Sequence, residues 1–259
     1  FCILILLHFS AKNNMLAAST FSQGVFSIYT WFLQMLQEHF QLVRTMKESA
    51  RGSITLIRHT ATNQSFVLRR FRGSAEVYRK LLDYTCPNLP ATLEVASQGE
   101  DCLVLEEYIP GDTLGFLLRG ALFTPAETRS IVEQVCRALW VLHSLGAVHR
   151  DVKPENIILR GSEAVLIDFD AARLYKPEET ADTQILGTTG FAAPEQYGLS
   201  QTDQRTDIFA VGILINIMLT GKHPSKQLAS GRLGRVVARC TQMAPNKRYP
   251  NVLRLMEDL

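Results

Sequence analysis

Three oxygen-bearing side chains stand at spacings that suit the chemistry of phosphate groups. Asp151 and Asn156 lie in one segment, His149–Asn156, and Asp168 directly follows a short apolar run. If that segment and that run border the same hairpin, the three side chains converge at one edge. Carboxylate and amide oxygens suit magnesium, and a carboxylate can receive the proton of an attacking hydroxyl. Magnesium-assisted phosphoryl transfer requires groups of these kinds in one place.

The elements that must position these residues are a helix before the loop and a hairpin after it. Thr124 and Glu127 are spaced as a capping box, and Gly146 is a natural helix stop. Apolar strands at 157–159 and 165–167 then flank a turn at 161.

A second helix is predicted after the hairpin. Residues 207–219 are apolar on nearly every side, which indicates a buried helix that ends at Gly221. The half of the chain before Pro110 is instead rich in short strands with β-branched and aromatic residues. A strand-rich half followed by a helix-rich half predicts an α+β fold. The strand-rich half is read as strands at 40–44, 53–58 and 65–71, a turn at 62–64, a helix at about 75–84, and strands near Leu93 and Leu103.

Composition excludes several classes of protein. The chain has 259 residues, 46% of them hydrophobic, with 27 basic and 25 acidic side chains. This balance does not support nucleic-acid or membrane binding driven by bulk charge. The five cysteines are scattered and contain no CxxC pair, which argues against a disulfide framework or zinc ribbon. We expect a reducing, cytoplasmic setting.

The N-terminal residues 1–37 differ from the rest, because Lys12 is their only formally charged side chain. The apolar run 1–7 is much shorter than the roughly 20 residues that span a bilayer. The longer uncharged stretch 13–37 is diluted by polar residues, so a membrane span is disfavoured. We expect 1–37 to be an extension outside the domain, with Met35 a plausible start.

The segment His149–Asn156, together with Asp168-Phe169-Asp170, resembles the catalytic loop and magnesium motif of eukaryotic-like (Hanks-type) protein kinases, most closely the bacterial serine/threonine branch. The resemblance extends over about 38–259 and implies a bilobal kinase fold, with a β-rich N-lobe at 38–108 and a helical C-lobe at 111–259. Further matches, in the family's order, are Glu107–Gly111 as the hinge, Gly187-Thr188, Ala193-Pro194-Glu195, Asp207 with Gly212, and Arg248.

The resemblance also assigns roles near the transferred group. Asp151 would deprotonate the acceptor hydroxyl, Lys153 would neutralise developing charge, and Thr188 would bond to both. Asn156 and Asp168 would hold Mg²⁺. Arg150 beside the catalytic aspartate implies phosphorylation of the following segment, with Thr180 and Thr183 as candidates for self-phosphorylation. We expect His149, Phe169, Asp207, Glu195 and Arg248 to serve mainly as scaffold.

The nucleotide-binding region departs from the family pattern. Of three expected glycine positions, 47, 49 and 52, only the last is glycine, and Arg69 replaces the lysine that contacts the ATP phosphates. Asp170 stands where the magnesium motif has glycine. Glu76 is the candidate helix partner of Arg69, and Glu106, an unusually polar residue before the hinge, is a second candidate partner. The residues implied in ATP binding are Gly52, Ile54, Val67, Arg69, Glu76, Glu107, Tyr108 and Ile158.

Three functions are compatible with this pattern. The first is a protein serine/threonine kinase that uses ATP and magnesium on a protein substrate. The second is a pseudokinase, a binding or scaffold module that holds nucleotide without turnover. The third, a small-molecule phosphotransferase, fits less well because Lys153 and the Gly-Thr and Ala-Pro-Glu segments serve a protein substrate.

Overall fold

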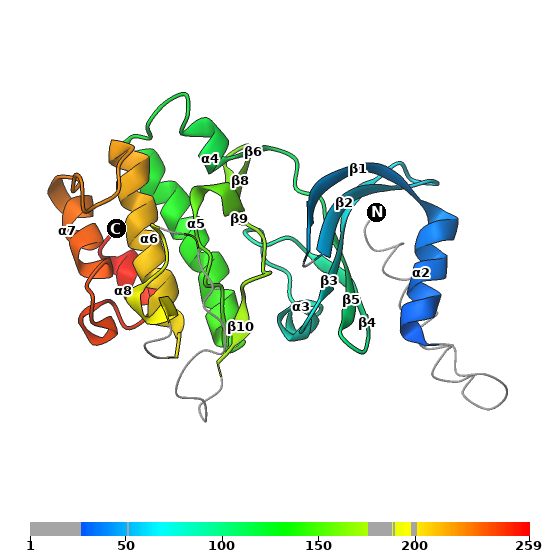
Figure 1. Ribbon diagram of the computed structural model, residues 1–259. Coiled ribbons are helices and arrows are strands. Elements are labelled where there is room, and N and C mark those ends of the chain that lie inside the picture. Colours follow the sequence, from blue (N-terminus) through cyan, green and yellow to red (C-terminus); the bar gives the residue numbers. More distant parts are fainter. Residues whose placement is uncertain (1–26, 51, 176–187, 189, 198–200) are drawn as a thin grey trace. The chain divides into compact units, whose positions relative to one another are not determined.

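Two units with different secondary structure make up the chain (Figure 1). The computed structural model describes residues 27–50, 52–175, 188, 190–197 and 201–259. The described part of unit 1 runs to Ala75 and resumes over Thr92–Tyr108, whereas unit 2 comprises Glu76–Ala91 and the described residues from Ile109 to Leu259.

Unit 1 is built on a five-stranded antiparallel sheet of order β1-β2-β3-β5-β4. Successive side chains of a strand point to opposite faces. Ile57, Phe66 and Leu105 therefore lie on one face, and Val67, Arg69 and Glu106 alternate with them. The strands are β1 (Phe40–Ser49), β2 (Gly52–His59), β3 (Ser65–Arg72), β4 (Thr92–Gln98) and β5 (Asp101–Glu107).

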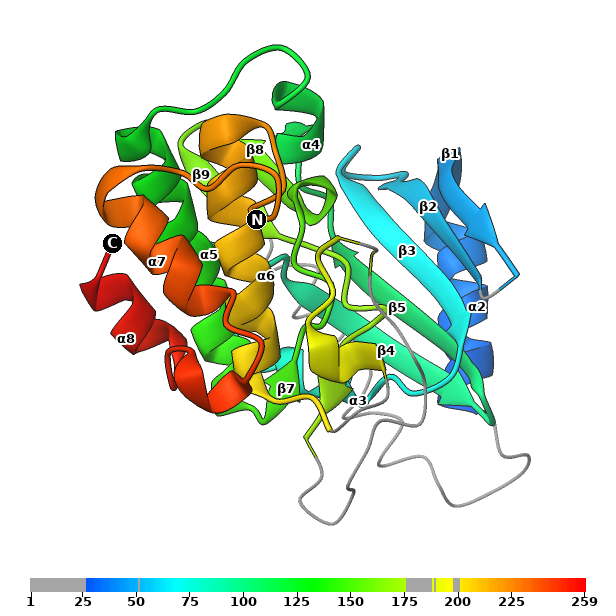
Figure 2. The same cartoon turned by 60° about the vertical axis from the view of Figure 1, so that its left-hand side comes forward.

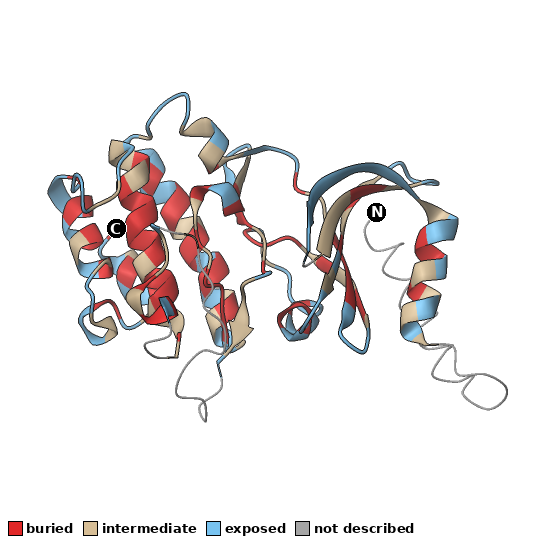
Figure 3. Cartoon of the chain, viewed as in Figure 1, coloured by how far each residue is buried: buried red, intermediate tan, exposed pale blue. Residues whose placement is uncertain are grey.

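A helix, α2 (Ile28–His39), covers one face of this sheet. Phe32 is fully buried there, with Met35 and Leu36 beside it, against sheet residues that include Phe66 and Leu105. Figure 3 colours the buried residues of α2 red, and its remaining residues tan or pale blue because they are half-buried or exposed. Of the predicted N-terminal extension, 1–37, the residues Phe32, Met35 and Leu36 pack against the sheet of unit 1.

Helices dominate unit 2, and α6 (Gln204–Thr220) lies at its centre (Figure 2). Eleven of its residues are buried, as its uniformly apolar sequence predicts. It packs against α5 (Pro125–Ser144) and α7 (Gly231–Cys240), while α8 (Val252–Glu257) packs against α5. The close approach of α7 requires Gly212, because a Cβ there would lie 2.5 Å from Cys240 Cβ.

Short elements complete unit 2. β8 and β9 form the predicted hairpin, with Gly161 in a left-handed turn at φ 62°. The helix η1 leads directly into this hairpin and carries Asn156. The remaining elements are α3 (Glu76–Leu81), β6 (Asp112–Thr113), α4 (Leu114–Leu117), β7 (Ala147–Val148), η1 (Pro154–Asn156), β8 (Ile157–Arg160), β9 (Glu163–Leu166), β10 (Arg173–Leu174), η2 (Pro194–Tyr197) and η3 (Pro245–Lys247).

Local signals in the sequence are confirmed where they are strong. The Thr124–Glu127 capping box is formed in both directions, and Gly221 ends α6 in the left-handed conformation at φ 68°. Two lengths differ from prediction. β1 continues to Ser49, and α3 spans only six residues, fewer than predicted.

Membrane spans were sought among the described helices alone. None of them is long and apolar enough to cross a bilayer.

Candidate active site

Asp151 lies at the centre of a hydrogen-bonded cluster in unit 2. Lys153 Nζ donates to Asp151 Oδ2 at 2.6 Å and to Thr188 Oγ1 at 2.7 Å, and Thr188 Oγ1 donates to Asp151 Oδ1 at 2.7 Å. The Asp151 side chain keeps 15% of its surface exposed, so an incoming hydroxyl can reach it. Charged partners shorten and strengthen such bonds, so the carboxylate is held in a fixed orientation.

Asn156 ties this cluster to the start of the β8–β9 hairpin. Its Nδ2 donates to both the main-chain oxygen and Oδ2 of Asp151, each at 2.9 Å. Because the amide nitrogen is engaged in this way, the amide oxygen is the atom that suits a cation. Ile167 N donates to Asn156 O at 2.9 Å, so the residue before Asp168 is hydrogen-bonded to the main chain of Asn156.

Asp168 follows β9 in a strained conformation. Its φ is 70°, which non-glycine residues adopt rarely and at a cost that concentrates at functional sites. Among the described residues, no three His, Cys, Asp or Glu side chains gather as a metal site. One carboxylate and one amide oxygen fit magnesium, which keeps waters and takes its remaining ligands from substrate phosphates.

Asp207, on the buried helix α6, holds the segment before Asp151. Its carboxylate accepts hydrogen bonds from the main-chain nitrogens of His149 at 2.9 Å and Arg150 at 2.8 Å, and from His143 Nε2 at 2.9 Å. Burial alone would raise the pKa of Asp207, but these hydrogen bonds and the nearby histidines lower it below its ordinary value. Arg150 has φ 68°, so this anchoring maintains a strained backbone beside Asp151.

Three aromatic rings form a column beside Asp168 and Asp170. Tyr78 on α3 meets Phe169 edge-on at 5.7 Å between ring centroids, and Phe169 meets His149 at 5.6 Å. Tyr78 also donates a long hydrogen bond of 3.4 Å to Asp170 Oδ1. The expected structural role of His149 and Phe169 matches this packing, whereas Tyr78 had no local sequence signal.

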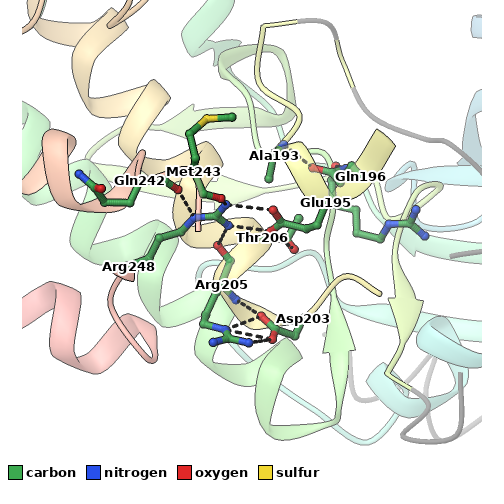
Figure 4. A network of polar contacts seen from close by, with 10 residues as sticks. Ala193, Glu195, Gln196, Asp203, Arg205, Thr206, Gln242, Met243 and Arg248 are labelled. Atoms are coloured by element: carbon green, nitrogen blue, oxygen red, sulfur yellow. Dashed lines mark hydrogen bonds and ion pairs between the residues drawn. The ribbon is translucent and has the colours of Figure 1, made fainter. Parts of the chain in front are cut away.

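A buried ion pair fixes the segment after Thr188 (Figure 4). Arg248 Nη1 and Nη2 contact the two oxygens of Glu195 at 2.6 and 2.9 Å, and Thr206 Oγ1 donates to Glu195 at 2.8 Å. Gln196, the next residue, donates from Nε2 to Arg150 O at 2.8 Å. Glu195 and Arg248 are scaffold, as expected, and Gln196 connects that scaffold to the loop of Asp151.

Unit 1 carries six of the eight predicted nucleotide residues, four of them on strands β2 and β3. Ile54 and Arg69 are cross-strand neighbours on β2 and β3, and Arg69 forms a buried ion pair with Glu106, as the sequence suggested. Gly52 has φ 151°, and a Cβ there would lie 2.0 Å from Arg70 O, so close packing on β3 requires this glycine.

The remaining predicted residues are distributed over both units. In unit 1, Val67 lies on β3, Glu107 is the last residue of β5, and Tyr108 is the last residue of the unit. Ile158 is on β8 and Glu76 begins α3, both in unit 2. The candidate phosphorylation sites at 180 and 183 lie outside the described residues.

Comparison with known proteins agrees with this architecture. The family model described as protein kinase domain matches residues 40–254. The chain therefore belongs to the protein kinase family, of the Hanks type found in bacterial serine/threonine kinases, and has the α+β fold of that family with two lobes.

Curated bacterial relatives are distant, and the chain spans less than half the length of each one compared. It is 29% identical over 184 residues to serine/threonine-protein kinase pkn2 of Myxococcus xanthus, covering 66% of this chain and 21% of that protein. It is 28% identical over 222 residues to serine/threonine-protein kinase D of Synechocystis, covering 76% and 43%. It is 34% identical over 161 residues to the probable serine/threonine-protein kinase PknB of Corynebacterium glutamicum, covering 60% and 25%.

Proposed function

We propose that the chain transfers the γ-phosphoryl group of ATP to a serine or threonine hydroxyl of a protein substrate. The observation that carries this proposal is the cluster of Asp151, Lys153, Thr188 and Asn156. It joins an oriented carboxylate to an ammonium group and a hydroxyl within hydrogen-bond distance. A structural role alone would not require a carboxylate held by three donors yet still reachable from solvent.

Asp151 acts as the base in this proposal. It accepts the proton of the substrate hydroxyl while that oxygen forms its bond to the γ-phosphorus and the bond to the ADP oxygen breaks. Lys153 stands against the same carboxylate and stabilises the negative charge of the phosphoryl group. Thr188 and Asn156 fix the direction of the Asp151 oxygens, so little reorganisation is needed during transfer.

Asn156 and Asp168 are proposed to hold Mg²⁺ through the amide oxygen and the carboxylate. When bound, magnesium supplies positive charge that neutralises the phosphate oxygens. The proposed nucleotide residues are Gly52, Ile54, Val67, Arg69, Glu76, Glu107, Tyr108 and Ile158. Self-phosphorylation at Thr180 or Thr183 is part of the same proposal.

A second candidate function is a pseudokinase that holds nucleotide without turnover. The observation that favours it is Arg69, which replaces lysine and is engaged by Glu106 in a buried pair. An arginine keeps the charge but presents a planar fork, so it is not equivalent to lysine at this position.

The test incubates the whole chain with labelled ATP and magnesium, and measures label on the chain and on a basic protein substrate. We expect incorporation that Asp151→Asn lowers by about 100-fold or more, because a general base is removed. Asp83→Asn, an exposed aspartate, is the matched control and keeps wild-type activity. Nucleotide binding without incorporation by the wild-type chain would favour the pseudokinase instead.

A further inference from the structure

Arg69 and Glu106 form an ion pair on the sheet face opposite helix α2. Arg69 Nε donates to Glu106 Oε2, and the two side chains are 6% and 3% exposed. Val67 is the cross-strand neighbour of Glu106, and Val104 is that of Arg69. Both side chains therefore project from the same face, diagonally placed on adjacent strands.

A charge buried to this extent is tolerated only with a partner of opposite sign. Removing water from either group alone is costly, and the attraction between the two offsets that cost. An arginine at position 69 therefore depends on an acidic residue within reach of β3. The same argument applies to Glu106, which follows the apolar residues 102–105 of β5. Its buried carboxylate depends on the positive charge of Arg69.

The atoms that meet also matter. A guanidinium presents donors along two edges, one containing Nε and one formed by the two terminal nitrogens. Because Glu106 contacts Nε, it fixes the plane of the guanidinium and the direction in which the terminal nitrogens point. A lysine ammonium is a point charge on a flexible stem and has no such plane to hold.

We infer that Glu106 is a positioning residue for Arg69, and that the two together replace the usual lysine anchor for the nucleotide phosphates. This inference rests on the proposed function, because it assumes that residue 69 binds ATP. It predicts that exchanging either residue alone disrupts the anchor. Replacing Arg69 by lysine and Glu106 by an apolar residue together restores the usual lysine anchor for the phosphates.

The experiment is a double-mutant cycle on the whole chain with Arg69→Lys, Glu106→Met and the double variant. The probe is the magnesium complex of adenylyl imidodiphosphate, titrated calorimetrically, and thermal unfolding without nucleotide is measured in parallel. Glu106→Gln, which keeps the shape of the side chain, replaces Glu106→Met if the latter does not fold. Arg70→Lys, an exposed residue of β3, and Glu94→Gln on β4 are matched controls.

We expect each single exchange to weaken probe binding by about tenfold, and the double variant to bind within about threefold of wild type. The two controls keep wild-type affinity. Unchanged affinity in the single variants, or simply additive losses in the double variant, overturns the inference and leaves the proposed function standing. A folded wild-type chain that does not bind the probe overturns both, whereas binding without phosphotransfer overturns only the proposed enzyme activity.

Discussion

Thr188 Oγ1 and Asp151 Oδ1 are joined by a hydrogen bond of 2.7 Å, although 37 positions separate the two residues in the chain. The bond brings Thr188 onto the loop that carries Asp151, the carboxylate proposed as the base. Lys153 Nζ contacts both residues, so the three side chains form a closed triangle. This triangle makes the hydroxyl of Thr188 a positioning group for the proposed reaction.

Thr188→Val is expected to lower kcat by about tenfold or more with little change in the KM for ATP. The substitution keeps the shape of the side chain but leaves Asp151 and Lys153 without the hydroxyl that orients them. Thr188→Ser retains the hydroxyl and should keep most of the activity. Steady-state phosphotransfer at varied ATP separates the two parameters, and equal losses in both variants would contradict an orienting hydroxyl.

Glu195→Gln is expected to destabilise unit 2 by about 3 kcal/mol, because it leaves the buried guanidinium of Arg248 without its counter-charge. That guanidinium also donates to the main-chain oxygens of Gln242, Met243 and Arg205, so it cannot move to solvent without losing these bonds. Urea unfolding measures the change.

The control for this experiment is Glu257→Gln, which breaks an exposed ion pair with Arg254 on α8. Exposed pairs contribute little, so its unfolding transition should match wild type. If the two variants shifted the transition equally, burial would not be the cause of the Glu195 effect.

His149 should make stability depend on pH. Burial lowers its pKa more than the nearby carboxylates of Asp207, Asp151 and Asp168 raise it. Below pH 6.5 the unfolded chain therefore binds a proton at this residue that the folded chain does not, and stability falls as the pH decreases. The loss should reach about 1 kcal/mol between pH 7.5 and 5.5.

The variant His149→Phe keeps an aromatic ring next to Phe169 but cannot titrate. The difference in free energy of unfolding between pH 7.5 and 5.5 should be smaller in this variant than in wild type, by that same amount. His223→Gln, in an exposed loop, should leave the dependence unchanged. An undiminished slope in His149→Phe would show that other groups cause the pH dependence.

Phe32→Ala is expected to cost about 3–5 kcal/mol, as for other fully buried aromatic residues. The same helix carries Ile28 with 59% exposure, and Ile28→Ala should change stability by less than about 0.5 kcal/mol. Amide hydrogen exchange on β3 and β5 is the measurement, because α2 covers these strands. Unchanged protection in Phe32→Ala would show that the sheet is stable without the helix.

The parts of the site that the sequence determined by itself are those specified by local chemistry. Turn residues and apolar runs close in the chain predict the hairpin between Asn156 and Asp168. The same local pattern places Asp151 and Lys153 on the loop before that hairpin. The Thr124–Glu127 capping box and the Gly221 helix end are local in the same sense, because the groups they satisfy lie within a few residues.

Only the tertiary structure determined the contacts between residues that are far apart in the chain. Asp207 reaches the main chain of His149 and Arg150, and Tyr78 reaches Phe169, without any signal in the intervening residues. Helix α2 belongs here too, because an uncharged segment gains its stability as a helix only when Phe32 finds an apolar sheet face. The spacing of residues in the sequence indicates which side chains carry the proposed chemistry. Long-range packing and buried charge determine which distant residues fix those side chains in position.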